Sequence, residues 1–208
     1  MNAEQMKKYI TPDLDPRKNA DHLFMYKGIN CRQTRRVLDS LDSLNVALSS
    51  SPPTTIIEIG TFHGAFTQLL RDHDISAQAS IHTFDIIDFN KRVEGTTLYV
   101  GDVFGDKHSC IVELISLPGR CLVFCDGGAK EREVNIFCKY LKSGDMILCH
   151  DYAKSLDVMN DKNIVGNWPP NQYESQWCNV KDSLTKFECV PFHEDEMQKS
   201  MWGSFIRQ

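Results

Sequence analysis

The side chains best suited to chemistry in this sequence are acids that end several short apolar runs, with one histidine beside the last acid. They are Glu58, Asp85, Asp102, Asp126, His150 and Asp151. Carboxylates accept hydrogen bonds from hydroxyl groups and bind hard divalent cations, and a histidine titrates near neutral pH and can act as a general base. A fold that brings these residues together would have a polar site able to hold a ligand and to move a proton.

The elements that must position these residues are short, almost continuously apolar runs, which alternate with helical patterns. The predicted strands span residues 55–59, 81–84, 97–100, 121–125 and 146–149, and the predicted helices span residues 65–72, 110–116 and 131–141. This alternation predicts a parallel sheet covered by helices on both faces. Because ligands of open α/β sheets bind beyond the carboxyl ends of the strands, we expect the acids to gather along one edge of the sheet.

The two ends of the chain depart from this alternation. Residues 34–48 have the spacing of an amphipathic helix, and the Ser-Ser-Ser-Pro-Pro stretch after it predicts a boundary between an N-terminal helical segment, residues 1–50, that covers the active edge and a main domain, residues 51–208. Near the other end, residues 154–172 are typical of a long loop and 173–184 of a helix. Two β-like runs, 186–192 and 201–206, joined through an acidic turn, predict an antiparallel hairpin.

The composition narrows the class of protein. The 208 residues, of which 41% are hydrophobic and 25% charged, suit one globular domain. The net charge of −5, without a cluster of Lys and Arg, disfavours a nucleic-acid partner. No apolar run approaches the roughly 18–20 residues that span a bilayer, so no membrane partner is expected. The eight cysteines, several of them inside apolar runs, predict reduced thiols in a cytoplasmic protein. The composition does not decide whether the protein forms a homo-oligomer.

Four motifs, each at the end of a predicted strand, are similar to those of one enzyme family. The segment from Ile56 to Gly64 resembles the E-x-G-x-x-x-G form seen in small-molecule O-methyltransferases. An acid ends the second strand, and Gly-Asp-Val follows the third. Asp-Gly-Gly after the fourth strand and His-Asp-Tyr after the fifth resemble a branch that includes sugar and natural-product O-methyltransferases. Over residues 35–208 the chain therefore resembles the class I S-adenosylmethionine-dependent methyltransferases.

The resemblance implies an α/β fold: a Rossmann-like three-layer sandwich whose mostly parallel, seven-stranded sheet has the order 3-2-1-4-5-7-6 and ends in an antiparallel hairpin. It also implies S-adenosylmethionine as the cofactor. The implied cofactor-binding residues are Glu58, Gly60, Thr61, Phe62, His63, Gly64, Asp85, Asp102, Val103 and Asp126. Glycines let the backbone approach the cofactor closely, and a helix N-terminus favours its carboxylate. Two alternatives stay open: Asp88 in the place of Asp85, and Asp102 as a helix cap.

The implied catalytic residues are Asp126, His150 and Asp151. In related metal-dependent enzymes, acids at the positions of Asp126 and Asp151 hold a divalent cation such as Mg²⁺, which orients a substrate hydroxyl and lowers its pKa. Without a metal, His150 is the candidate general base, and its alternative is a packing role. The chain departs from its relatives at Gly128 and Ala129, where they carry an acid or a histidine. Lys130 is close by and could substitute, but a solvated lysine at the start of a helix is the commoner case.

Aromatic residues in two segments suggest a cover over the pocket. Trp168, Tyr173 and Trp177 in and after the long loop are a candidate substrate lid, and Phe24, Tyr26 and Gly28 near the N-terminus are a second candidate cover.

The leading hypothesis is methyl transfer to an oxygen of a small-molecule acceptor. Two alternatives stay open: a protein that binds S-adenosylmethionine without transferring its methyl group, and a nucleotide-dependent oxidoreductase on a similar sheet. The spacing from Gly60 to Gly64 lacks the G-x-G-x-x-G pattern of such oxidoreductases and disfavours the second alternative.

Overall fold

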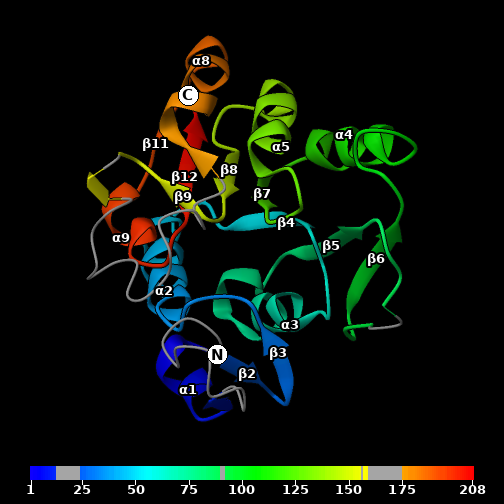
Figure 1. Ribbon diagram of the computed structural model, residues 1–208, viewed down its shortest axis with the longest axis vertical. Coiled ribbons are helices and arrows are strands. Elements are labelled where there is room, and N and C mark those ends of the chain that lie inside the picture. Colours follow the sequence, from blue (N-terminus) through cyan, green and yellow to red (C-terminus); the bar gives the residue numbers. More distant parts are fainter. Residues whose placement is uncertain (13–23, 90–91, 156, 159–174) are drawn as a thin grey trace.

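A seven-stranded sheet forms the centre of the computed structural model, which describes residues 1–12, 24–89, 92–155, 157–158 and 175–208 (Figure 1). Its strands are β4 (Pro53–Ile59), β5 (Ser80–Asp85), β6 (Thr96–Val100), β7 (Arg120–Cys125), β8 (Met146–Cys149), β11 (Cys189–Pro191) and β12 (Gly203–Arg207). They lie in the order β11-β12-β8-β7-β4-β5-β6. Counted along the chain and read from the β6 edge, this is the predicted order 3-2-1-4-5-7-6.

The direction of the strands also follows the prediction. β4 pairs in parallel with both β5 and β7, so that Ile57 lies opposite His82 on one side and Val123 on the other. β12 runs antiparallel to β8 and to β11, with Val190 opposite Ile206. The carboxyl ends of β4 to β8 therefore point to one edge of the sheet, which is where the acids are expected.

Helices cover both faces of the sheet and make it the middle of three layers (Figure 1). They are α2 (Val37–Ala47), α3 (Ala65–Asp72), α4 (His108–Ser116), α5 (Lys130–Phe137), α8 (Trp177–Lys186) and α9 (Glu194–Gln198), with 3₁₀ turns at Asp74–Ser76 and Cys138–Tyr140. Side chains that alternate along β4 enter opposite cores. Ile56 packs with Leu41 of α2 and Leu69 of α3, whereas Ile57 packs with Ile111 of α4 and Phe137 of α5. Burial on both faces explains why the central strands β7 and β8 are almost continuously apolar.

The N-terminal segment contains more than the predicted helix. Before α2 it has a short helix, α1 (Ala3–Lys7), and a three-stranded antiparallel sheet of β1 (Ile10–Pro12), β2 (Phe24–Tyr26) and β3 (Ile29–Cys31). Strands of three residues are too short to produce a periodic pattern. The segment shares one core with α3, and the amino group of Met1 donates to the carbonyl of Asp72 at 2.8 Å. The division at residue 50 stays a prediction.

The C-terminal part differs in detail from the sequence prediction. The predicted acidic turn between the last two strands is the start of α9, because His193 adopts a left-handed backbone and acids fill the first helical turn. α8 begins at Trp177, preceded by a short strand, β10 (Ser175–Gln176), which pairs with β9 (Tyr152–Ala153). Most of the predicted loop 154–172 lies outside the described residues.

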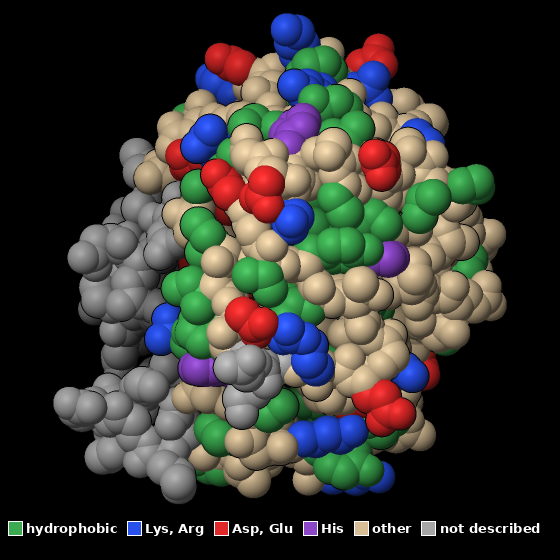
Figure 2. All heavy atoms as spheres, turned by 90° about the vertical axis from the view of Figure 1, so that its right-hand side faces the viewer, with side chains coloured by type: hydrophobic (Ala, Val, Ile, Leu, Met, Phe, Trp, Pro, Cys, Tyr) green, Lys and Arg blue, Asp and Glu red, His purple; other side chains and the backbone are tan. Residues whose placement is uncertain are grey.

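Three further findings complete the description of the fold. All eight cysteines are free thiols, and six of them are buried, as predicted. None of the helices in the described ranges is both long and apolar enough to cross a bilayer. On the side that carries β6, basic and acidic side chains are interspersed and hydrophobic ones gather near the middle (Figure 2).

Candidate active site

A cavity of about 1050 Å³ runs along the carboxyl ends of β4, β5, β6, β7 and β8. Ten of the twelve residues predicted for the site line it: Gly60, Thr61, Phe62, His63, Asp85, Asp102, Val103, Asp126, His150 and Asp151. Its size is at the upper end of the ~300–1,000 Å³ typical of ligand pockets. The strand ends thus gather the acids at one edge of the sheet, as expected.

The turn after β4 is held in a form that only glycine permits at its first position. Gly60 has a φ of +98°, and a Cβ atom there would lie 2.3 Å from the backbone oxygen of Asp126. Phe62, two residues later, also has a positive φ of +49°, and Gly64 with a φ of +78° begins α3. The backbone of the turn therefore lies against the end of β7. Backbone strain of this kind is concentrated at ligand sites.

Asp85 ties the turn to the end of β5. One of its carboxylate oxygens accepts from the backbone N–H of Phe62 at 2.7 Å, and the other accepts from that of Ile87 at 3.0 Å. Asp88, the alternative to Asp85, forms an ion pair with Arg92 and does not line the cavity. The geometry therefore favours Asp85.

Asp102 closes the turn after β6. Its side chain accepts from the backbone N–H of Phe104 at 2.8 Å, which caps this turn, and α4 begins only after Lys107. The side chain of Asp102 and its neighbour Val103 both line the cavity. Asp102 is thus a turn cap at the cavity wall rather than the cap of α4.

Glu58 lies beneath the turn and does not line the cavity. It is fully buried, and one carboxylate oxygen accepts from the hydroxyl of Thr67 at 2.5 Å. The other oxygen has no hydrogen-bond partner among the described residues. Burial raises the pKa of Glu58 to about 8, because a low-dielectric surrounding disfavours the charged form. Glu58 joins β4 to the first turn of α3.

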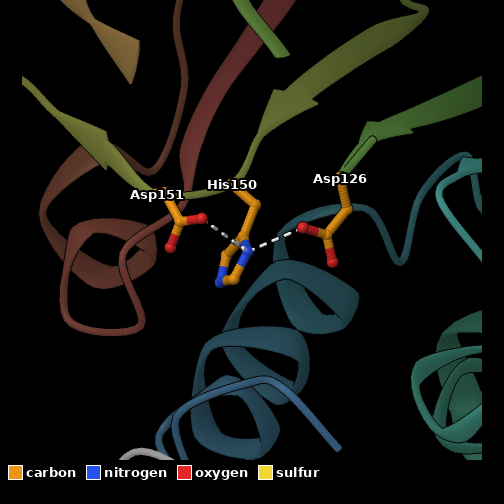
Figure 3. Close-up of side chains that lie close together, drawn as sticks. All are labelled: Asp126, His150 and Asp151. Atoms are coloured by element: carbon orange, nitrogen blue, oxygen red, sulfur yellow. Dashed lines mark hydrogen bonds and ion pairs between the residues drawn. The ribbon is translucent and has the colours of Figure 1, made fainter. Parts of the chain in front are cut away.

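Asp126 follows β7, and His150 and Asp151 follow β8, so the three side chains meet at neighbouring strand ends (Figure 3). His150 Nδ1 donates to Asp126 Oδ1 at 2.7 Å and lies 3.6 Å from Asp151 Oδ2. Asp151 has a φ of +51°, which turns the chain sharply after β8. The three residues predicted for catalysis form one cluster.

The charges of this cluster act on the imidazole. His150 is buried, with 5% of its surface exposed, and its ring packs on Trp202 with 4.7 Å between centroids. Burial acts to lower the pKa of His150, but the carboxylates of Asp126 and Asp151 outweigh it and hold this pKa above its usual value. A histidine held between two acids is suited to accept a proton and to be stabilised once it carries the charge.

Solved structures share this fold, although sequence comparison finds no relative: no family model matches the chain, and neither does any curated protein. The structure of CmcI with Mg and SAM has a TM-score of 0.62 and 13% identity, over 98% of this chain and 84% of that chain. CmcI with SAH has a TM-score of 0.56 and 15% identity, over 95% and 92%.

A second enzyme, the MycE methyltransferase from the mycinamycin biosynthetic pathway, in complex with Mg, SAH and mycinamycin VI, has a TM-score of 0.51 and 13% identity, over 82% of this chain and 49% of that chain. The chain has the class I methyltransferase fold. Identities this low show the fold alone, so the chemistry of this methyltransferase fold must be argued from its own residues.

Two residues that sequence reasoning missed connect the cluster to the rest of the fold. Gln33, just after β3, donates from Nε2 to Asp126 Oδ2 at 2.7 Å, and its Oε1 accepts from the indole N–H of Trp202 at 2.9 Å. Gln33 is 2% exposed. A single glutamine outside any motif carries no signal in the sequence, because its partners lie far along the chain.

Glu133, in the first turn of α5, is the second residue that was missed. It accepts from the backbone N–H groups of Gly127 and Ala129, each at 3.3 Å, and it lines the cavity. Burial raises the pKa of Glu133 to about 7. An acid in the first turn of a helix is an ordinary signal for its start, which is why the sequence alone could not mark it as part of a site.

The predicted covers of the pocket are wrong where they can be examined. Phe24 and Tyr26 are fully buried in the core, because β2 packs on α3, and Gly28 lies in the turn after β2; none of the three lines the cavity. The same segment instead contributes Asn30, Arg32 and Gln33.

The prediction of a substrate lid is also wrong for Trp177, the one of its three residues that the structure describes. Trp177 stacks on Phe205 with 5.9 Å between ring centroids and is absent from the lining of the cavity. Trp168 and Tyr173 lie outside the described residues.

The cluster also offers ligand atoms of the kinds that divalent cations bind. Asp126, His150 and Asp151 each offer a ligand atom, and these atoms lie within 4.8 Å of one another. Two carboxylate oxygens and an imidazole nitrogen are donors that such ions accept in proteins. His150 therefore adds a third ligand atom to the two predicted metal-binding residues, Asp126 and Asp151.

Proposed function

We propose that the protein is an S-adenosylmethionine-dependent methyltransferase that methylates an oxygen of a small-molecule acceptor. The observation that carries the proposal is one cavity that joins the turn Gly60–Gly64 to the cluster of Asp126, His150 and Asp151. A ligand on the turn and an acceptor at the cluster would share this cavity. The fold shared with CmcI and MycE, which were solved with SAM or SAH, supports the choice of cofactor.

The turn supplies what the amino-acid end of this cofactor needs. The first N–H groups of α3 lack partners within the helix and favour a carboxylate. Phe62 and His63 line the cavity next to them. Asp85 and Asp102 present carboxylates at the ends of β5 and β6, where they would accept hydrogen bonds from the ribose hydroxyl groups and the adenine amino group. The acidic lining also suits a cationic sulfonium.

At the cluster, His150 is the proposed base. S-adenosylmethionine, when bound, supplies an electrophilic methyl group on a sulfonium. Asp126 accepts the Nδ1 proton of His150, which leaves Nε2 as the nitrogen that takes the proton of the acceptor hydroxyl. The two carboxylates stabilise the imidazolium that results. Positioning the acceptor against the methyl group supplies most of the acceleration.

A divalent cation is the second way to activate the acceptor. Asp126, His150 and Asp151 would hold it, and such an ion would lower the pKa of a bound hydroxyl. CmcI and MycE were both solved with Mg. If turnover needs the ion, a chelator suppresses it and Mg²⁺ restores it, whereas turnover that ignores the chelator leaves His150 as the base.

The cellular setting completes the proposal. The eight free thiols suit a reducing compartment, and we place the protein in the cytoplasm. Its proposed partner is the small-molecule acceptor, and neither a nucleic acid nor a membrane is proposed.

Calorimetry with S-adenosylhomocysteine tests the first step. We expect binding to a single site, and the absence of binding at high micromolar concentration would overturn the proposal. A larger thermal stabilisation by a nicotinamide nucleotide than by S-adenosylhomocysteine would favour an oxidoreductase instead.

Transfer is tested with a panel of hydroxylated acceptors. We expect His150→Ala to lower methylation by about 10²–10⁴-fold, the usual contribution of a positioned base, while S-adenosylhomocysteine still binds. Binding without methylation of any acceptor would show a cofactor-binding protein that has no transferase activity.

A further inference from the structure

Lys130 lies inside the candidate active site as a buried cation. It opens α5, four residues after Asp126, and its side chain is only 7% exposed. Its Nζ is 3.3 Å from Asp151 Oδ2 and 4.0 Å from Asp126 Oδ1. Lysine is rarely buried unless its charge is paired, and here its partners include the two carboxylates that would hold a metal.

We propose that Lys130 holds the cation position of the cluster, so that its ammonium group replaces a divalent metal ion. The part of this inference that concerns methyl transfer rests on the proposed function, whereas the part that concerns metal binding does not. From the sequence, Lys130 was a candidate substitute for the acid or histidine missing at Gly128 and Ala129. Its ion pairs with Asp126 and Asp151 indicate that it would replace a metal ion instead.

The first argument is the charge balance between the acids. An ion shared by Asp126 and Asp151 would lie within a few ångströms of the ammonium group, and like charges repel strongly where water is excluded. The ion would bind only if Lys130 left both carboxylates. Because its side chain is buried against them, leaving would also break two ion pairs.

The second argument is the scarcity of other donors. Gly128 and Ala129 stand where related enzymes carry an acid or a histidine, and their side chains cannot bind an ion. The third donor, His150 Nδ1, already donates to Asp126 at 2.7 Å. A metal would therefore have to displace a lysine and also break a hydrogen bond, and no further His, Cys, Asp or Glu of the part of the chain that the structure describes joins the cluster as a ligand in return.

The ammonium group can also do the work of the ion in the proposed reaction. Lys130 lines the cavity beside His150. As the acceptor oxygen attacks the methyl carbon, the carbon–sulfur bond breaks, the sulfide leaves, and the hydroxyl proton passes to His150. Lys130 keeps its own proton throughout and stabilises the negative charge that develops on the oxygen.

Manganese binding tests the inference without any turnover. The probe is free aqueous Mn²⁺, whose electron paramagnetic resonance signal is lost on binding, titrated into the full chain. Lys130→Met removes the charge and keeps the bulk of the side chain. We expect this variant to bind Mn²⁺ at least about tenfold more tightly than the wild type, because a like charge leaves the ion's position. Asp126→Asn in the same background should abolish the gain.

Lys199→Met is the matched control. Lys199 forms an ion pair with Glu196 on α9, with 2.7 Å between the charged atoms, and both residues lie outside the cavity. Its Mn²⁺ affinity should equal that of the wild type. Lys130→Gln replaces Lys130→Met if the latter does not fold, as judged by its thermal melting.

Three results would overturn the inference. They are a wild type that binds Mn²⁺ as tightly as Lys130→Met, no Mn²⁺ binding by either protein, or an equal gain in Lys199→Met. Calorimetry with S-adenosylhomocysteine on the same samples keeps the two proposals separate. Failure to bind this ligand contradicts the proposed function, whereas the manganese result alone decides the role of Lys130.

Discussion

The two ends of the cavity are built in different ways. At the turn end, main-chain groups make the site: Gly60 packs against the backbone of Asp126, and the N–H of Phe62 donates to Asp85. At the cluster end, side chains make the site: His150 donates to Asp126, and Gln33 reaches Asp126 across 93 residues of sequence. The turn end therefore depends on main-chain geometry, whereas the cluster end depends on how side chains pack.

Substitution of Gly60 gives the largest expected effect and tests the turn end. In Gly60→Ala the new methyl group meets the backbone oxygen of Asp126 at 2.3 Å, so the turn must move. We expect S-adenosylhomocysteine binding to weaken by at least about 100-fold and the free energy of unfolding to fall by about 3 kcal/mol, as measured by calorimetry and urea unfolding.

Gly28→Ala is the matched control for Gly60. Gly28 also has a positive φ, +78°, but a Cβ atom there meets nothing within 4 Å. It should lose only the roughly 1 kcal/mol that a left-handed backbone costs a non-glycine residue and should bind normally. Equal losses in both variants would show that the close approach to Asp126 is unimportant.

Glu58 is expected to have the next largest effect, through the pH dependence of stability. Its pKa rises from the ordinary glutamate value of 4.5 to about 8 in the folded protein. Between these values the folded protein keeps a proton that the unfolded chain has released. The stability that this proton contributes is complete below pH 4.5 and is lost as the pH rises through 8.

Glu58→Gln should therefore remove that loss. We expect the wild type to lose on the order of 3 kcal/mol more than the variant between about pH 5 and pH 8, as measured by urea unfolding at both values. Glu133, with a pKa of about 7, contributes a slope of the same sign in both proteins. Equal slopes would contradict the buried neutral form of Glu58.

Gln33→Leu tests the cluster end and should have the smallest effect. It leaves Asp126 Oδ2 and the indole N–H of Trp202 without the hydrogen bonds of 2.7 and 2.9 Å that they now make. We expect turnover to fall about tenfold and stability by about 1 kcal/mol, while the affinity for S-adenosylhomocysteine stays constant.

Gln68→Leu is the control, because Gln68 on α3 donates to Asp72 and does not line the cavity. Its turnover should be unchanged. If Gln33→Leu weakened cofactor binding as much as turnover, the two ends of the cavity would not be separable.

The sequence predicted the fold well because strands that are buried on both faces of the sheet appear in the sequence as short apolar runs. The run Thr55–Ile59 is apolar on both sides of the sheet, and the order of all seven strands follows from the family resemblance. The small N-terminal sheet was missed because its three strands have three residues each. The start of α9 was taken for a turn because acids are common in both.

The residues of the site also divide into those that the sequence predicted and those that it did not. Gly60, Asp85 and Asp102 were predicted from short motifs, since strand ends place them at the cavity. Gln33 was not, because its position near Asp126 depends on how the N-terminal segment packs. The sequence also did not predict how deeply each side chain is buried. Glu58 was expected in the pocket and instead lies beneath it.

The contact between Gly60 and the backbone of Asp126 has a consequence for redesign. The floor of the turn and the start of the cluster are one wall, made of main-chain atoms from β4 and β7. For the proposed reaction, the distance from a methyl donor on the turn to a base at the cluster would then be fixed by the sheet. An engineer seeking a new acceptor would leave that wall intact and vary other side chains that line the cavity, such as Arg32.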